Sequence, residues 1–304
     1  MLLEIQKDTD ITKLSTLRVK AMAELFIAPK SIEEVIEVFV EIKKHNWTWN
    51  ILGAGSNTLL SSRSIPGVLI STNNLDFLNK ISDDTYEAGA GMRMPKFCAL
   101  MSRESLAGTE FMEGIPGSIA GGIVMNAGAH GSEISDILIS AKLLNIETLQ
   151  VEEWDKTRLG LRYRHSDIDP HKYMILSGTF KLKADDKDAI RARVVANNHS
   201  RTTKQPIKSW TCGCTFQNPL STYGAGKLIE DLGLKGYKQG DFMISNLHGN
   251  FFENIGDGTS MDFCKLMAHV QERALAEKNL VLKPEVKPMG VFSEEELKVW
   301  SSLN

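Results

Sequence analysis

Short apolar runs rich in β-branched and aromatic residues alternate along the chain with a few segments of helical periodicity. The clearest helical segment spans residues 31–46, where apolar side chains recur at positions 32, 35, 36, 39, 40 and 42. This spacing predicts one buried stripe on an amphipathic helix. Ser31 is the predicted N-cap, and Glu34 stands at the capping-box position three residues later.

The other expected elements follow from the same two periodicities. Strand patterns dominate the first two thirds of the chain, and helices alternate with strands in the last third, which predicts an α+β protein. We place the main boundary between residues 185 and 205, where a helical pattern replaces the strand pattern. The expected strands are 23–29, 47–52, 67–72, 85–92, 137–147, 174–184, 249–254 and 281–288, and the expected helices are 95–106, 188–198, 225–232 and 259–278.

Composition restricts the class of protein. A chain of 304 residues is long enough for about two domains. The 42% hydrophobic and 24% charged residues are typical of globular proteins. A net charge of −3 argues against nucleic acid as the main partner, but leaves room for a local basic pocket that binds an anionic small molecule.

The chain carries no pattern typical of secretion or membrane insertion. Its first residues include acids and a lysine in place of a signal-peptide core, and no run approaches the ~18 apolar residues of a membrane span. Four scattered cysteines in a chain of this size favour free thiols over a disulfide scaffold. We therefore expect a cytoplasmic protein without a membrane partner.

Two glycine-rich segments are candidates for binding a phosphate-bearing cofactor. The turn GAGSN (53–57) directly follows an expected strand, and its backbone N–H groups could form an anion-binding nest. A Rossmann fingerprint is excluded because serines and a proline follow the turn in place of a third glycine and a helix. The second segment, 113–135, is the stronger candidate, since five glycines fall between Gly114 and Gly128. The alternatives are a simple tight turn for the first segment and close packing of a helix on a sheet for the second.

Several charged residues could take part in catalysis or binding. Arg164 lies in YRHS (163–166), and a fixed guanidinium there could stabilise a developing carboxylate or enolate. Glu285 lies in LKPEVKP (282–288), where strand alternation would place it with Lys283 and Lys287 on the polar face. Arg201 and Lys204 form a basic pair suited to a diphosphate. A solvated surface position is the alternative for each of them.

The stretch WTCGCTFQNP (210–219) holds two of the four cysteines, Cys212 and Cys214. Structural zinc sites use C-x₂₋₄-C with a second pair of ligands, and C-x-C has neither that spacing nor a second cluster nearby. The C-x-x-C redox motif is also absent. Two interpretations remain from the residues alone, which are inert packing and proton donation by a thiol.

Taken together, these segments resemble the UDP-N-acetylenolpyruvoylglucosamine reductases, flavoenzymes of peptidoglycan precursor synthesis. The resemblance runs from about Leu14 to the last expected strand, so it covers nearly the whole chain, and the order and spacing of the motifs are specific. The matching motifs are LSTLRV (14–19), LGAGSN (52–57), GIPGSIAGG with MNAGA (114–129), YRHS (163–166), CGCTFQNP (212–219), AGKLIEDLGLKG (225–236), SNLHGNF (245–251) and LKPEV (282–286).

The resemblance implies an FAD-binding domain of the vanillyl-alcohol-oxidase type at residues 1–190, with lobes at about 1–66 and 67–190. A smaller α+β substrate-binding domain would follow at 191–304. The chain is similar to the shorter class of the family, which lacks an insertion that caps the substrate. The implied cofactor is non-covalent FAD, and the small-molecule partners are NADPH and UDP-N-acetylglucosamine enolpyruvate. We expect a monomer.

The resemblance also implies roles for individual residues. It carries the catalytic roles over to Arg164, Cys214 and Glu285, and its register selects Cys214 over Cys212, which stands where a small residue is usual. The implied substrate contacts are Tyr163, Arg201, Lys204, Asn218 and His248. The implied FAD contacts are Gly53, Ala54, Gly55, Ser56, Asn57, Thr58, Gly114, Ile115, Pro116, Gly117, Ser118, Gly121, Gly122, Asn126, Ala127 and Gly128.

The implied reaction passes a hydride from NADPH by way of FAD to C3 of the enolpyruvyl group. Arg164 and Glu285 would stabilise the charge that builds on the carboxylate, and Cys214 would then protonate C2. Two other classes stay open at this point. A related flavin oxidase with oxygen as acceptor would share the cofactor domain, and a nucleotide-binding module would bind without catalysis.

Overall fold

Residues 4–301 are described by the computed structural model, and they divide into two units. Unit 1 consists of Phe26–Ala54 and Val68–Arg201 with the residues up to Ile5, and unit 2 consists of Gln6–Leu25, Gly55–Gly67 and the chain from Thr202 onward. The two units therefore do not correspond to a single division of the chain at residue 190. Two N-terminal segments, Gln6–Leu25 and Gly55–Gly67, belong to the same unit as the C-terminal part. The assignment of separate cofactor and substrate domains stays a prediction.

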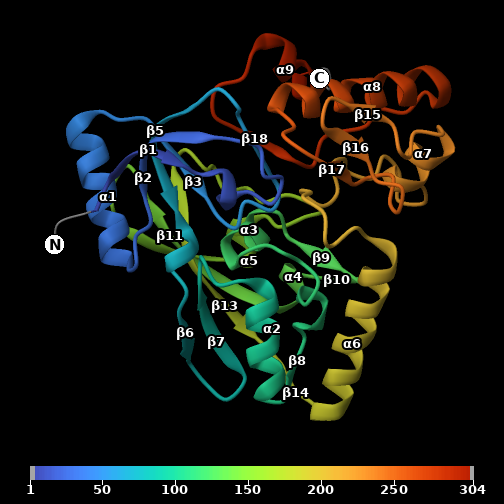
Figure 1. Ribbon diagram of the computed structural model, residues 1–304. Coiled ribbons are helices and arrows are strands. Elements are labelled where there is room, and N and C mark those ends of the chain that lie inside the picture. Colours follow the sequence, from blue (N-terminus) through green and yellow to red (C-terminus); the bar gives the residue numbers. More distant parts are fainter. Residues whose placement is uncertain (1–3, 302–304) are drawn as a thin grey trace. The chain divides into compact units, whose positions relative to one another are not determined.

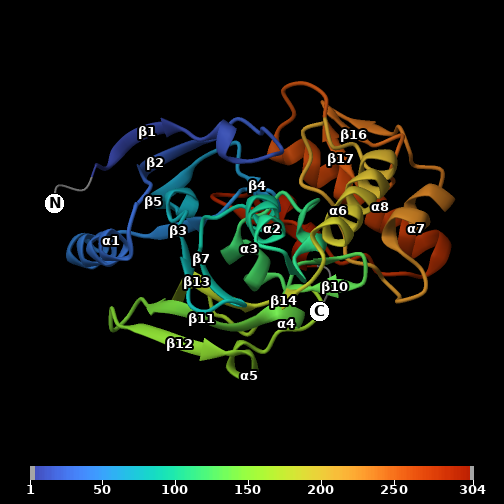
Figure 2. The ribbon, with the colours of Figure 1, turned by 90° about the horizontal axis from the view of Figure 1, so that it is seen from below.

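An antiparallel sheet of five strands forms the centre of unit 1 (Figure 1). Its strand order is β12-β11-β13-β7-β6. Helices α2 and α3 pack on one face, where apolar residues such as Phe97 of α2, Ile123 of α3 and Phe180 of β13 form one buried cluster (Figure 2). The elements are β6 (Leu78–Lys80), β7 (Thr85–Gly89), β11 (Leu138–Asn145), β12 (Val151–Asp155), β13 (Tyr173–Lys181), α2 (Met94–Arg103) and α3 (Ile119–Val124).

Helix α1 (Ile32–His45) confirms the helix predicted over 31–46. The Ser31 side chain accepts a hydrogen bond from Glu34 N, as expected of an N-cap, while the Glu34 carboxylate binds Lys30 N and so does not complete a capping box. One position of the predicted stripe is wrong, since Val40 is exposed and Val38 is buried in its place. The buried face follows the 3.6-residue period from Val35, which places 38 and not 40 toward the core.

Strand β3 (Trp49–Leu52) precedes the GAGSN turn and pairs in parallel with β5 (Ile65–Ser71). Phe39 of α1 meets Trp49 edge to face, with ring centroids 5.5 Å apart. After the turn the chain enters another strand, β4 (Thr58–Leu60), and no helix follows directly. This order agrees with the exclusion of a Rossmann unit from the sequence.

Unit 2 packs helices against a small antiparallel sheet with the order β15-β16-β17 (Figure 1). Phe242 of β16, Phe252 of β17 and Phe263 of α8 form the aromatic centre of its buried cluster. Strand β4 pairs separately, in parallel with β18. The elements are α7 (Ala225–Asp231), β15 (Lys238–Gln239), β16 (Phe242–Ile244), β17 (Phe252–Asn254), α8 (Ser260–Lys278), β18 (Lys287–Met289) and α9 (Glu294–Ser301).

Two expected elements differ most from the bounds in the structure. Helix α6 (Lys187–Lys204) runs beyond the expected end at Asn198, because no glycine or proline interrupts the chain before Pro206. The strand expected over 281–288 is regular only at β18, since Pro284 cannot donate to a ladder. The remaining elements are short: β1 (Gln6–Asp10), β2 (Met22–Ile27), β8 (Leu106–Ala107), β9 (Gly128–Ala129), β10 (Ser132–Glu133), β14 (Lys183–Ala184), α4 (Ile134–Ile137), α5 (Lys156–Leu159) and the 3₁₀ turns Thr12–Leu14, Thr72–Asn74 and Glu110–Met112.

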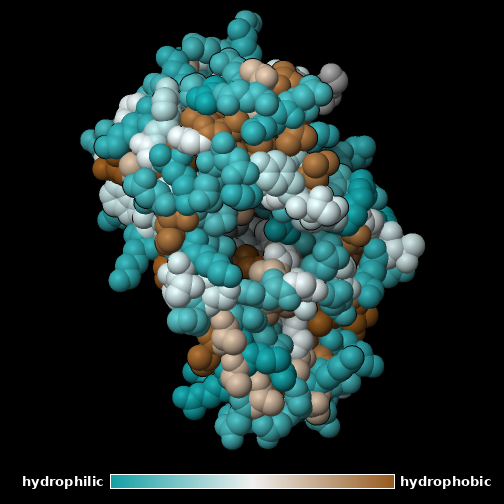
Figure 3. All heavy atoms as spheres, turned by 90° about the vertical axis from the view of Figure 1, so that its right-hand side faces the viewer, coloured by the Kyte–Doolittle hydropathy of each residue, from teal (hydrophilic) through white to brown (hydrophobic). Residues whose placement is uncertain are grey.

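The surface in Figure 3 is mostly hydrophilic, with apolar residues in small separate groups. Across residues 4–301, none of the helices combines the length and the apolar character needed to cross a bilayer.

A capping box at the start of α8 gives a test of the fold of unit 2. Thr259 Oγ1 accepts from Asp262 N at 3.2 Å, and Asp262 Oδ2 accepts from Thr259 N at 3.0 Å. We expect Thr259→Ala to lower the free energy of unfolding by about 1 kcal/mol, because it leaves a helix N–H without its partner. Urea denaturation would measure the loss, with the exposed Thr157→Ala as a control that stays within about 0.5 kcal/mol. Equal effects of the two substitutions would contradict the capping role.

Candidate active site

The segment that carries Cys214 lies between two other stretches of unit 2. An antiparallel bridge joins Cys214 to Phe251 on one side, and a second joins Phe216 to Pro284 on the other. Glu285 N donates to Thr215 O at 2.8 Å. The structure thus brings Cys214 and Glu285, two of the three predicted catalytic residues, onto neighbouring segments.

Asn57 from the GAGSN turn is tied to the same place. Its Nδ2 donates to the carbonyl oxygen of Glu285 at 3.1 Å, and its own carbonyl accepts from Lys287 N at 3.0 Å. The parallel pairing of β4 with β18 continues this contact beyond the turn. Asn57 therefore holds the backbone of Glu285 in place, and its predicted contact with FAD remains a prediction.

The two cysteines of the C-G-C turn have different environments. Cys212 is only 4% exposed and belongs to the apolar cluster of unit 2. Burial raises the pKa of the Cys212 thiol to about 12, and Cys214 adds to the rise. All four cysteines are free, and Cys214 alone among them is partly accessible. A buried thiol held in its neutral form fits the packing role expected for Cys212.

His248 lies in unit 2 close to Asn250 and Phe251. Its Nδ1 accepts from Asn250 N at 3.2 Å, so the neutral ring carries its proton on Nε2. Burial lowers the pKa of His248, and the positive charge of Lys235 lowers it further. The ring is therefore neutral at pH 7 and offers Nε2–H as a hydrogen-bond donor.

Asn218 has a structural partner in addition to its predicted role. Its Oδ1 accepts from Ala225 N at 3.0 Å, at the first turn of α7. Sequence reasoning placed Asn218 in the substrate pocket, and that role is not tested by this contact. The hydrogen bond fixes the loop between Cys214 and α7.

In unit 1 the first two residues of the GAGSN turn, Gly53 and Ala54, lie close to the second glycine-rich segment. A Cβ built on Gly53 would lie 2.9 Å from Ser118 Oγ, so there is no space for a side chain at that position. Arg93 spans the two segments, with Nη1 3.5 Å from the carbonyl oxygen of Ala54 and 3.4 Å from that of Pro116. The side chain of Ser118 caps α3 by accepting from Gly121 N.

Close packing of a helix was the alternative explanation for the glycines of the second segment, and it accounts for part of that segment. A Cβ on Gly122 would lie 2.8 Å from Met94 Sδ, so Gly122 lets α3 approach α2 closely. Gly121 is exposed, and its nearest neighbour would be Ser118 Oγ at 3.6 Å. Packing therefore gives no reason for a glycine at 121, and close approach of a ligand to the backbone does.

Unpaired polar atoms show whether unit 1 fits a cofactor. Thr72 Oγ1 is buried beside Gly53, and Asn126 Nδ2 is buried in the second glycine segment. Neither atom has a hydrogen-bond partner within the described part of the chain, although buried polar atoms almost always have one. Both atoms can donate a hydrogen bond, so they fit a ligand rich in acceptors, such as the diphosphate and the ring system of FAD.

Arg164 and Tyr163 form the tip of a tight turn in unit 1. Arg162 and His165 exchange two backbone hydrogen bonds across it, at 3.1 and 2.9 Å, and Arg164 adopts a left-handed φ of 54°. The guanidinium carbon lies 5.0 Å from the centre of the Tyr163 ring, and Tyr163 is 52% exposed. The turn thus presents a cation and an aromatic ring together, and their predicted roles stay predictions.

Arg201 and Lys204 lie on the last turn of α6, not in the loop that the sequence suggested. Arg201 passes directly over Gly114, where a Cβ would lie 2.7 Å from Arg201 Cδ. The structure therefore places Arg201 beside the second glycine segment. The predicted contacts of both residues with substrate stay predictions.

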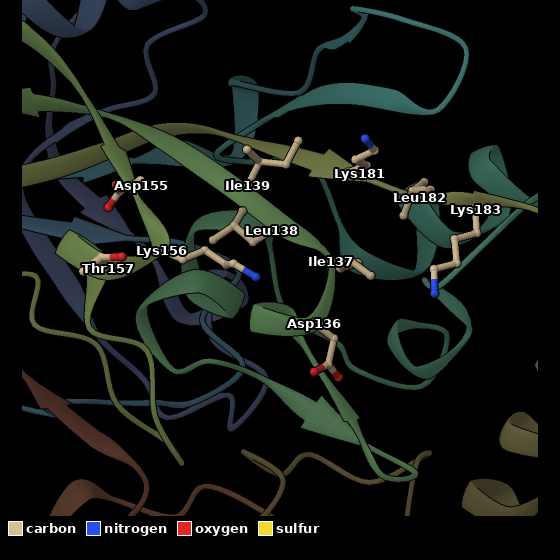
Figure 4. Close-up of a pocket in the computed structure, with 10 residues that line it drawn as sticks. All are labelled: Asp136, Ile137, Leu138, Ile139, Asp155, Lys156, Thr157, Lys181, Leu182 and Lys183. Carbon is tan, nitrogen blue, oxygen red and sulfur yellow. The ribbon is translucent and has the colours of Figure 1, made fainter.

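A surface pocket of about 480 Å³ lies elsewhere in unit 1 (Figure 4). It is formed by the ends of β11, β12 and β13 with α4 and α5, and it contains none of the predicted site residues. Lys181 and Lys183, two of the lysines that line it, point in opposite directions in Figure 4.

Comparisons with known proteins cover nearly the whole chain. Residues 205–289 match the C-terminal domain of UDP-N-acetylenolpyruvoylglucosamine reductase, and residues 23–148 match an FAD binding domain. The enzyme of that name from Bacillus pumilus is 35% identical over 289 residues, covering 94% of each chain. The chain belongs to the UDP-N-acetylenolpyruvoylglucosamine reductase family.

Two further relatives support this membership. The reductase of Trichormus variabilis is 37% identical and covers 95% of this chain and 87% of its own length. The crystal structure of the Thermus caldophilus reductase superposes with a TM-score of 0.80 at 29% identity, covering 95% of this chain and 99% of that one. As a member of the reductase family, the chain is a flavin-dependent oxidoreductase with FAD as cofactor, and the α+β fold class is confirmed. The matched FAD-binding range contains both glycine segments.

The sequence did not predict the contacts that three further residues make with the site. Arg93 and Thr72 stand outside the glycine segments and contact them only through the fold. Asn250 lies within the motif SNLHGNF, yet only the structure shows its contact with the segment of Cys214. No sequence signal points to this contact, because Asn250 and Phe216 are 34 residues apart in the chain.

The geometry of the GAGSN turn leads to a test by substitution. Gly55 has φ of 64°, and a Cβ there would overlap the carbonyl oxygen of Leu14. Gly233 has a similar φ of 69° with open space around it. We expect Gly233→Ala to cost about 1–2 kcal/mol of unfolding free energy and Gly55→Ala at least ~3 kcal/mol, because only the second adds a clash to the left-handed backbone. Chemical denaturation measures both, and equal losses would contradict the close approach.

The lowered pKa of His248 predicts a pH dependence. Below pH 6.5 the unfolded chain takes up a proton that the folded protein resists, so the free energy of unfolding falls as the pH drops through this range and is constant above it. His248→Asn keeps an acceptor for Asn250 N and should remove this part of the slope. Urea titrations across pH would measure the difference between the two proteins. An NMR titration midpoint of His248 at or above 6.5 would contradict the prediction.

Proposed function

We propose that this chain reduces UDP-N-acetylglucosamine enolpyruvate to UDP-N-acetylmuramate, with FAD as cofactor and NADPH as hydride donor. The observation that carries the proposal is the contact of the Cys214 segment with Glu285 in a chain of the reductase family. A thiol and a carboxyl group on adjacent segments are the pair needed to protonate a substrate carbon and to stabilise a neighbouring carboxylate.

Each group has one task in the proposed reaction. FAD, when bound, supplies the hydride that adds to C3 of the enolpyruvyl double bond. The Cys214 thiol gives its proton to C2, which completes the lactyl ether, and solvent returns a proton to the thiolate. Arg164 and the protonated carboxyl group of Glu285 donate hydrogen bonds to the substrate carboxylate while negative charge builds on it, and losing one such donor costs about 3 kcal/mol of activation free energy.

The other predicted residues bind the two ligands. The proposed role of Arg164 is supported by its place at the tip of a turn, where its guanidinium group lies beside the ring of Tyr163. His248 would donate from Nε2 to the nucleotide sugar, and Lys204, Arg201 and Asn218 would complete the substrate contacts. The two glycine segments with Ser118 would hold FAD. We also propose that the protein is a cytoplasmic monomer.

Spectroscopy of the two half-reactions tests this function. Anaerobic NADPH should bleach the flavin absorbance near 450 nm, and UDP-N-acetylglucosamine enolpyruvate should restore it in the absence of oxygen. Restoration by oxygen alone at a rate matching turnover would indicate an oxidase. A purified protein that binds no FAD would refute flavin catalysis altogether.

The assignment of the acid predicts different effects for the two cysteines. Cys214→Ala should leave flavin bleaching by NADPH unchanged and slow reoxidation by the enolpyruvyl substrate by ~10²–10⁴-fold, because only the second step needs the proton. Cys212→Ala should be nearly silent in both steps. Stopped-flow absorbance measures each half-reaction. Equal loss in both half-reactions, or an inactive Cys212→Ala beside an active Cys214→Ala, would refute the assignment.

A further inference from the structure

Asn250 makes an unusual set of contacts with the segment that carries Cys214. It is only 2% exposed, in unit 2. Its side-chain Oδ1 accepts from Phe216 N at 2.9 Å, and its Nδ2 donates to Phe216 O at 2.8 Å. One amide thus satisfies both backbone polar groups of a single residue.

The side chain of Asn250 pairs with the backbone of Phe216 at a place where no neighbouring strand does so. Phe216 is 1% exposed, so water cannot satisfy its N–H and C=O groups, and it belongs to no regular strand. An asparagine side chain carries the same donor and acceptor as a peptide group, in the same plane. Aspartate lacks the donor, and alanine lacks both groups.

The backbone of Asn250 extends the connection in two directions. Its carbonyl accepts from Thr215 N at 2.9 Å, and its N–H donates to His248 Nδ1 at 3.2 Å. Thr215 O in turn accepts from Glu285 N. Asn250 is therefore bonded to the segment next to Cys214 and to His248, and is one residue removed from Glu285.

We propose that Asn250 is a positioning residue for the Cys214 acid. The inference rests on the proposed function of Cys214 and adds a residue to it. The amide of Asn250 holds residues 215–216 in the one backbone arrangement that aims the Cys214 thiol at substrate. Removing the amide frees this segment without touching FAD, NADPH or substrate.

Asn254 offers a matched control in the same unit. It is 5% exposed, its Nδ2 donates to Leu17 O at 2.9 Å, and its Oδ1 accepts from Gly258 N at 3.1 Å. The Asn254 Oδ1 also accepts from Gly256 N at 3.2 Å. Asn250→Ala and Asn254→Ala therefore each remove a buried amide with the same two kinds of bond, and the second removes one accepted bond more. Both should lower the melting temperature, but only the first loosens the Cys214 segment.

The experiment measures three properties of the FAD-loaded wild type and of both variants. The first two are the rates of flavin bleaching by NADPH and of reoxidation by UDP-N-acetylglucosamine enolpyruvate. The third is the rate at which iodoacetamide alkylates Cys214, followed by mass spectrometry of its peptide. A merely structural role would not separate these rates.

For Asn250→Ala we expect bleaching within about twofold of wild type and reoxidation slower by about 100-fold, the cost of a misplaced reacting group. Alkylation of Cys214 should be faster by roughly tenfold, because the two buried hydrogen bonds between the Asn250 amide and Phe216 no longer oppose local opening. Asn254→Ala should match wild type in all three rates. If Asn250→Ala does not fold, Asn250→Asp, which keeps the acceptor for Phe216 N, takes its place with the same expected direction.

Two outcomes would overturn the inference. One is wild-type reoxidation and alkylation in the Asn250 variant, and the other is an equal change in the Asn250 and Asn254 variants. If the wild-type protein itself is not reoxidised by the enolpyruvyl substrate, the proposed function fails instead. The alkylation rates then still decide whether Asn250 orders the Cys214 segment.

Discussion

The candidate site depends on the backbone of Thr215, whose two polar groups join three segments of unit 2. Its carbonyl accepts from Glu285 N, and its N–H donates to the carbonyl of Asn250. Thr215 is fully buried, so these bonds are shielded from water, and breaking either one leaves an unsatisfied group in the core. The positions of Cys214, Glu285 and His248 relative to one another follow from this junction. The Asn57 contact then attaches the GAGSN turn to the same framework.

In unit 1 the main constraint is the limited space next to the backbone of Gly53. Gly53 and Ser118 are too close for a side chain at position 53, and buried atoms of Thr72 and Asn126 keep unused hydrogen-bonding capacity. Buried polar atoms almost always have a hydrogen-bond partner, and a bound ligand would supply one here. Gly122 serves the packing of α3 on α2, so a single glycine-rich segment combines a structural requirement with a binding one.

Much of this fold could be predicted from the sequence, because its helices and strands carry strong local signals. Ser31 and the spacing from Val35 to Ile42 predicted α1 to within a residue at each end. The end of α6 was missed because its last turns are polar and have no stop signal before Pro206. The separation of Cys212 from Cys214 needed the family resemblance, and their difference in burial supports it. Arg93, Thr72 and Asn250 could not be predicted, since their contacts join residues far apart in the chain.

The central claim is that the framework around Thr215 aims the Cys214 thiol at the substrate carbon that receives a proton. A crystal structure of the FAD-loaded protein with bound UDP-N-acetylglucosamine enolpyruvate tests this most directly. The account predicts Cys214 Sγ within about 3.5 Å of C2 of the enolpyruvyl group, a near-attack distance, with the Glu285 carboxyl group at the substrate carboxylate. A structure in which Cys214 points away from C2 while another proton donor contacts it would contradict the account.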